Sequence, residues 1–267
     1  MFLMSWSVNA EAITIKNFWY ESMTIAPPAS RFFDFRLGLG IPITLMVLLL
    51  VFEPTRLDFA IARTFYAPDS GFIGRHSFWL EDILHDRAKQ AVIIFGILAI
   101  VGFLISLVSK RLRTLRRRLG YLVLSLALST GIVTPLKQLT AVHCPWSLIE
   151  FGGKEQFTSL IEKRAPTEKL GRCWPGGHAS AGFSLIALFF FLRDRRPFNA
   201  RIALAIALVT GSVFSVGRMM QGAHFLSHNL WTLLIDWTIC LLCYRWLLYR
   251  IPVGKENMKS KYVIQEM

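Results

Sequence analysis

Long apolar runs separated by short polar segments are the main pattern of this chain. A bilayer core about 30 Å thick requires about 20 largely apolar residues in a spanning helix. Six segments come close to this length: roughly 36–53, 89–108, 119–137, 178–192, 201–217 and 229–248. No repeat or low-complexity tract interrupts the pattern. It predicts an all-α, polytopic membrane protein with a bundle of about six transmembrane helices, in one domain that covers residues 1–267.

Composition supports this class and assigns roles to the two ends. Hydrophobic residues make up 54% of the 267 residues, and the mean hydropathy is +0.46, which is too apolar for an ordinary soluble domain. Residues 1–35 lack the order of a signal peptide, in which a basic region is followed by an apolar region and then by small residues. They are aromatic and charged, which predicts an N-terminal interfacial segment. Residues 250–267 are expected to form a cytoplasmic tail.

The formal net charge of +13 is concentrated in short segments between the apolar runs. Segments 109–118 and 193–201 are rich in arginine, and the C-terminal tail adds further lysines. The positive-inside rule places all three in the cytoplasm, where anionic lipid headgroups are their natural partners. Nucleic-acid binding would need aromatic side chains among the charges, and these segments have almost none. Membrane lipids are therefore the expected partners, and nucleic acid is not.

Three polar stretches stand out against this background: residues 137–146, 172–180 and 217–231. Counting spans from the cytoplasmic arginines brings all three to the same, external membrane face. The stretch 217–231, taken alone, also fits a short solvated turn between two helices. Three polar stretches at one depth favour a site instead.

The side chains of these stretches are cationic or titratable, without a carboxylate cluster: Lys137, His143, Arg172, His178, Arg218, His224 and His228. A hard cation would need Asp and Glu ligands. Zinc could use His224 and His228 at helical spacing, but no Glu lies between them. An anion such as phosphate fits better, because Lys gives a point charge and Arg a matching fork. The turn before His178 can add backbone N–H groups. Two histidines then suffice for covalent phosphoryl transfer.

The three stretches resemble the signature of the type 2 phosphatidic acid phosphatase (PAP2) superfamily. Its motifs are K-x6-R-P, P-S-G-H and S-R-x5-H-x3-D. In this chain they correspond to Lys137 through Cys144 and Pro145, to Pro175 through His178, and to Gly217 and Arg218 followed by His224 and His228. The resemblance covers roughly residues 137–231, and its first motif carries a CPW variant. The six-helix plan agrees with the membrane branch of lipid phosphate phosphatases.

The resemblance implies a role for each matching residue. His224 would be the nucleophile that forms a phosphohistidine, and His178 the general acid. Lys137, Arg218 and the Gly177 amide would hold phosphate oxygens, without a metal or another cofactor. The implied activity is hydrolysis of a lipid phosphate or pyrophosphate, at the periplasmic face of a bacterial inner membrane. A phosphotransferase with the same intermediate and a catalytically silent lipid-phosphate binder or transport component remain alternatives.

Four positions depart from the family pattern: Cys144, Gly176, Gly217 and His228 stand where Arg, Ser, Ser and Asp are usual. Each lost group would cost about 2–4 kcal/mol of transition-state stabilisation if it acted like an oxyanion-hole donor. Arg172 and His143 are candidate replacement cations. His228 or Asn229 is a candidate acceptor for the His224 ring.

Two further features follow from the expected topology. Cys144 and Cys173 both lie outside and flank the first two motifs, so we expect a disulfide between them, with two free thiols as the alternative. The chain-entropy model gives such a loop about 3–4 kcal/mol of stabilisation. Asp236 lies deep in the last span, where an acid is either functional or paired.

Overall fold

The structure is a computed structural model that describes residues 30–75, 77, 78, 80, 88–163 and 170–250. Phe32–Tyr249 form one contact unit, whereas Ser30, Arg31 and Arg250 belong to another. In the latter unit the Arg250 N–H donates to Ser30 Oγ at 2.8 Å. The expected interfacial segment lies mostly outside the described residues, as does the expected tail after Arg250. The prediction of a single domain stays a prediction.

Helices dominate the described residues. They are α2 (Phe35–Val51), α3 (Thr55–Thr64), α4 (Ala88–Val108), α5 (Arg116–Thr140), α6 (Gly177–Phe183), α7 (Ile186–Leu192), α8 (Pro197–Met220) and α9 (Leu226–Leu247). Short 3-10 turns, η2 (Arg113–Leu115), η3 (Pro145–Ser147) and η4 (Ile149–Phe151), and a hairpin of β1 (Tyr66–Ala67) and β2 (Gly71–Phe72) complete the set. The expected all-α fold class is confirmed.

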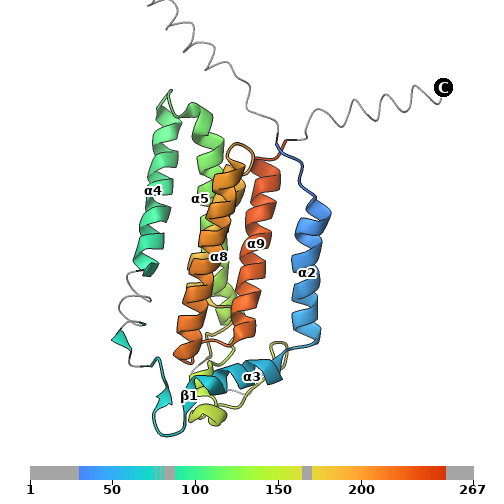
Figure 1. Cartoon of the computed structure of the whole chain (residues 1–267), viewed down its shortest axis with the longest axis vertical. Coiled ribbons are helices and arrows are strands. Elements are labelled where there is room, and N and C mark those ends of the chain that lie inside the picture. The colour runs from blue at the N-terminus through green and yellow to red at the C-terminus, as the bar shows by residue number, and fades with distance from the viewer. Residues whose placement is uncertain (1–29, 76, 79, 81–87, 164–169, 251–267) are drawn as a thin grey trace, which may run out of the picture. The chain divides into compact units, whose positions relative to one another are not determined.

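Four helical segments in the described residues are long and apolar enough to cross a membrane, or five if α2 and α3 form one bent span. These four segments correspond to α4, α5, α8 and α9 (Figure 1). Many large apolar side chains of α4 point outward, such as Ile94 and Leu98, which are 57% and 62% exposed. Acyl chains would cover these side chains in a bilayer. The chain is therefore an integral membrane protein, and the count of six spans stays a prediction.

The segment expected to be the fourth span is shorter than the others and consists of two helices. Helices α6 and α7 are separated at Ser184 and Leu185, where turn hydrogen bonds replace the regular helical pattern. Both helices pack closely on α8. A Cβ at Gly182 would lie 2.6 Å from Gly211 Cα, so the close approach of α6 to α8 requires glycine here.

The core lies between α5, α6, α7 and α9. Tyr121 and Tyr244 are completely buried there, and the Tyr121 hydroxyl donates to the Cys240 carbonyl at 3.2 Å. Asp236 is also completely buried, and Ser180 Oγ donates to its carboxylate at 3.3 Å. This contact joins α9 to α6, so the acid in the last span has a partner within the bundle.

The polar segments gather at the two ends of the bundle. At one end, Arg118 donates to the Phe191 carbonyl at 2.5 Å, which joins the first arginine-rich segment to the end of α7, just before the second. At the other end α3 bends by 86° from α2 and lies across the bundle near β1 (Figure 1). Phe59 of α3 stacks on Phe225 with ring centroids 5.2 Å apart. Ala62, Phe72, Leu148 and Phe151 complete this small apolar cluster at the end of the bundle that carries α3.

Candidate active site

Lys137 lies one turn before the end of α5, at the end of the bundle that carries α3. The helix ends at Ala141, which adopts the left-handed conformation (φ 48°) and donates its N–H to the Lys137 carbonyl. The Lys137 side chain is half-buried and extends toward the start of α6. A Cβ at Gly177 would lie 3.3 Å from Lys137 Nζ. The first motif therefore places its cation beside the backbone of the second.

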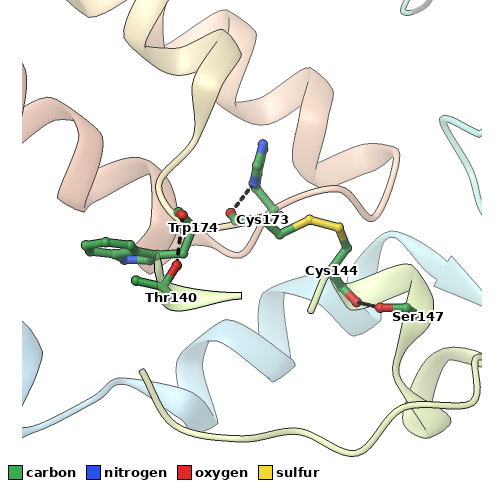
Figure 2. The surroundings of a disulfide bond; sticks show 6 residues. Thr140, Cys144, Ser147, Cys173 and Trp174 are labelled. Atoms are coloured by element: carbon green, nitrogen blue, oxygen red, sulfur yellow. Dashed lines mark hydrogen bonds between the residues drawn. A yellow bond between two sulfur atoms is a disulfide. The ribbon is translucent and has the colours of Figure 1, made fainter. Parts of the chain in front are cut away.

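Hydrogen bonds hold the second motif against α5 on one side and α9 on the other. The Cys173 N–H donates to the Val142 carbonyl at 3.0 Å. Thr140 Oγ1 donates to the Trp174 carbonyl at 3.3 Å (Figure 2). The Gly176 N–H donates to Thr232 Oγ1 at 2.8 Å. His178 follows as the second residue of α6 and is half-buried.

His224 lies in the short loop between α8 and α9 and is only 4% exposed. Its Nδ1 is 2.7 Å from the Cys173 carbonyl oxygen. Because a carbonyl only accepts, Nδ1 carries the proton and Nε2 keeps its lone pair. Burial lowers the pKa of His224 well below its ordinary value, and the nearby cations Lys137 and Arg218 lower it further. The imidazole is thus neutral at neutral pH.

Arg218, in the last turn of α8, is held by two side chains. Its Nη1 donates to Gln221 Oε1 at 2.7 Å, and its guanidinium lies 5.8 Å from the ring centroid of Trp146. The main-chain N–H of Trp146 in turn donates to the Gly222 carbonyl at 3.0 Å. Gln221 is buried and was missed from the sequence, because a Gln in a polar turn has no distinctive signal there. Trp146 explains the third residue of the CPW variant.

Two of the expected cations have other surroundings. His143 Nε2 lies 3.8 Å from Glu155 Oε2, so the His143 ring faces a carboxylate that competes with an anionic ligand. Arg172 is exposed. The structure thus brings Lys137, Gly177, Arg218 and His224 together and leaves His143 and Arg172 at the edge of this group.

The acceptor for the His224 ring differs from the two candidates named from the sequence. The Cys173 carbonyl takes this place, rather than His228 or Asn229. His224 precedes α9, and Phe225 is extended, so helical spacing does not relate residues 224 and 228. Their rings meet edge to face, with centroids 6.1 Å apart. In the described residues no group of three or more His, Cys, Asp or Glu side chains could hold a metal ion.

Asn229 occupies the space beside Gly176. A Cβ at Gly176 would lie 2.5 Å from Asn229 Oδ1 and 3.3 Å from Thr232 Oγ1. The Asn229 Nδ2 donates to the Phe225 carbonyl at 3.1 Å, which fixes the side chain in this position. A serine at residue 176 would therefore collide with a buried amide, and glycine at this position is required by its neighbour.

A disulfide joins Cys144 to Cys173, with the two Cα atoms 5.1 Å apart. It links the loop after α5 to the segment that leads into α6 (Figure 2). Cys240 and Cys243 are free and buried in α9. The first residue of the CPW variant thus makes a covalent connection between the first motif and the segment directly before the second.

The comparison with protein families agrees with this arrangement. The family model of the PAP2 superfamily matches residues 118–252, half of the chain, and this range contains all three motifs. Comparison with curated proteins and with solved structures gives no match. Membership of this family indicates phosphatase-type activity on lipid phosphates. The chain therefore belongs to the PAP2 superfamily, as an all-α integral membrane protein.

Proposed function

We propose that the chain is a metal-independent phosphatase that hydrolyses a lipid phosphate or pyrophosphate through a phosphohistidine on His224. The observation that carries the proposal is the state of His224. It is buried and neutral, its Nδ1 is engaged, and the charges of Lys137 and Arg218 act on it. A neutral imidazole beside two cations suits attack on a bound phosphate.

The proposed reaction has two displacement steps at one phosphorus atom. His224 Nε2 attacks phosphorus, the bond to the leaving oxygen breaks, and His178 gives that oxygen a proton. Water then attacks the phosphohistidine while His178 takes a proton from it, and inorganic phosphate and free His224 result. Lys137, Arg218 and the Gly177 N–H would hold the phosphate oxygens, whose charge is largest in the transition state.

We further propose that the site faces the periplasm of a bacterial inner membrane. The support is that the arginine-rich connection between α4 and α5 lies at the opposite end of the bundle from the loop between α8 and α9, which carries His224 (Figure 1). The positive-inside rule assigns the arginine-rich end to the cytoplasm. Membrane lipids are then the source of the substrate, which would reach the site from the outer leaflet. No nucleic acid is expected as a partner.

The experiment is a phosphate-release assay on the purified full-length protein, with a panel of lipid monophosphates and pyrophosphates in detergent and a chelator present throughout. We expect release by the parent, and its loss in His224→Asn and His178→Ala. His224→Asn keeps a donor toward the Cys173 carbonyl but has no nucleophilic nitrogen. Lys154→Ala, in the exposed outer loop, is the control and should retain activity.

Three results would count against the proposal. Complete loss of activity with the chelator would remove the metal-independent mechanism. Equal activity of the parent and both histidine variants would remove the assigned roles. Binding of the lipids without release would favour the silent binder. Transfer of labelled phosphate to a second lipid instead of water would identify the phosphotransferase, which shares the same intermediate.

A further inference from the structure

We infer that the main-chain carbonyl of Cys173 is the positioning group of His224, and that the Cys144–Cys173 disulfide keeps this carbonyl in place. Turnover would then depend on the oxidised state of a cysteine pair that itself does not touch the substrate. The inference rests on the proposed function, because His224 is taken as the nucleophile. It adds a group and a redox dependence that the sequence did not indicate.

The need for such a group follows from the chemistry of imidazole. A histidine attacks through one nitrogen only if the other holds the proton, and a hydrogen bond to that proton fixes both the tautomer and the ring. A carboxylate at residue 228 would usually supply the acceptor, but this chain has His228. The 2.7 Å contact between His224 Nδ1 and the Cys173 oxygen supplies it instead. Nε2 is then the nitrogen that can attack.

Three connections fix the Cys173 carbonyl, and they run to the last residue of α5 or to the segment directly after it. The Cys173 N–H donates to the Val142 carbonyl at 3.0 Å. Its sulfur is bonded to that of Cys144. The next carbonyl, that of Trp174, accepts from Thr140 Oγ1 at 3.3 Å. Cys173 and Trp174 are only 4% and 7% exposed, so packing adds to these connections.

These connections fix the position of the proposed nucleophile, His224, relative to the proposed phosphate-binding cation, Lys137. Residues 141–144 follow directly on α5, the helix that carries Lys137, and the Ala141 N–H donates to the Lys137 carbonyl. The chain of contacts therefore runs from Lys137 through residues 141–144 and Cys173 to His224. A shift of the carbonyl would move the imidazole relative to the bound phosphorus and would free it to adopt the other tautomer.

The disulfide is the one covalent connection in this chain of contacts. Reduction by a phosphine gives the disulfide two electrons and two protons, and two thiols form while the phosphine becomes its oxide with oxygen from water. Two hydrogen bonds then remain to hold the segment. Loss of such a supporting contact typically costs about 10- to 100-fold in activity. We expect this loss in kcat, with KM nearly unchanged, because Lys137 and Arg218 still bind the phosphate.

The test compares the oxidised full-length protein with the same protein after reduction by a phosphine in detergent micelles. We expect kcat to fall about 10- to 100-fold and KM to change by less than about 3-fold. The Cys144→Ala/Cys173→Ala double variant should have the low kcat from the start and should not respond to the phosphine. A Cys243→Ala variant, whose thiol is buried away from the site, should respond as the parent does.

Nitrogen NMR on histidine-labelled protein separates positioning from simple stabilisation. In the oxidised protein the His224 signals, assigned with His224→Asn, should show one tautomer with the proton on Nδ1. After reduction they should show a mixture of tautomers. If reduction lowers only the melting temperature, while kcat per folded molecule and the tautomer stay the same, the inference is overturned.

The two proposals can fail separately. Absence of phosphate release from the oxidised parent, with an intact Nδ1 tautomer that reduction disturbs, would reject the proposed activity and leave the positioning contact standing. Normal release that is indifferent to the phosphine would reject the positioning role and leave the phosphatase standing. Reduction of the folded parent serves as the test even if the cysteine variants do not fold.

Discussion

Two of the four departures from the family pattern, Cys144 and Gly176, have a specific neighbour that accommodates them. Cys144 is bonded to Cys173, and Trp146, two residues later, lies over the Arg218 guanidinium. Gly176 leaves room for the Asn229 side chain. These three contacts are compatible with one another in the structure. Cys144 and Gly176 are therefore each matched to a particular residue elsewhere in the site.

The dependence between residues 176 and 229 can be tested by a double-mutant cycle. Gly176→Ser alone should lower stability by about 1–3 kcal/mol, because the new side chain overlaps the buried Asn229 amide. Asn229→Ala should relieve part of this loss in the double variant. Melting in detergent gives the coupling energy, which we expect to be at least about 0.5 kcal/mol. Simple additivity would show that the two positions do not compete for space.

The buried state of His224 predicts a pH dependence of both activity and stability. Its pKa is lowered in the folded protein, by burial first and then by the charges of Lys137 and Arg218. The folded state thus resists protonation, whereas the unfolded chain takes up a proton near its ordinary pKa of about 6.5. The contribution of His224 to stability is present above this pH and is lost as the pH falls below it.

The measurements are a series of melting temperatures and of kcat/KM values from pH 8 to pH 5. The melting temperature of the parent should fall more steeply below about pH 6.5 than that of His224→Asn, which has no imidazole to protonate. The acidic limb of kcat/KM should lie below the same pH, since His224 stays neutral there. An acidic limb at or above pH 7 would contradict a lowered pKa.

At the scale of elements, α3 controls how α9 begins. The Asp58 carboxylate of α3 accepts from the Ser227 N–H at 2.9 Å and from its hydroxyl. Phe225, the residue before α9, has no side-chain oxygen to cap the helix. A carboxylate from another helix therefore satisfies the N-terminal N–H groups of α9, next to His224 and His228. Helix α3 thereby supports the site without contributing a catalytic residue.

Removal of this carboxylate should destabilise the protein. Asp58→Ala should lower the free energy of unfolding by about 1–2 kcal/mol, which is typical of a lost helix cap. Asp69→Ala, at an exposed position of the hairpin turn, is the matched control and should change it by less than about 0.5 kcal/mol. Both values come from denaturation in mixed micelles. Equal stability of the two variants would show that Asp58 does not cap α9.

At the scale of the whole bundle, the arginine-rich segments and the candidate active site lie at opposite ends of the helices. The contact of Arg118 with the Phe191 carbonyl marks the basic end, whereas His224 contacts Cys173 at the other end. A membrane potential and anionic lipids both favour the basic end in the cytoplasm. Because the two lie at opposite ends, the orientation of the bundle in the membrane determines which side of the membrane the site faces.

Cysteine labelling in intact cells tests the orientation. Lys154→Cys and Lys110→Cys place one exposed thiol at each end of the bundle, in the loop after α5 and in the first arginine-rich segment. A membrane-impermeant maleimide should label the first variant in intact cells and the second only after lysis. The native thiols Cys240 and Cys243 are buried, which keeps the background low. Labelling in the reverse order would place the site in the cytoplasm.

The sequence by itself determined the membrane class, the helical fold and the family, because apolar runs, basic segments and the spacing of three motifs are local properties. It also led to the hypothesis that Lys137, Arg218 and His224 belong to one phosphate site. Only the tertiary structure decided that the Cys173 carbonyl meets His224 and that the segment 178–192 splits into α6 and α7. A main-chain acceptor has no side-chain signature, and helix breaks and contacts between distant segments depend on packing. These features appear only when the segments are assembled in three dimensions.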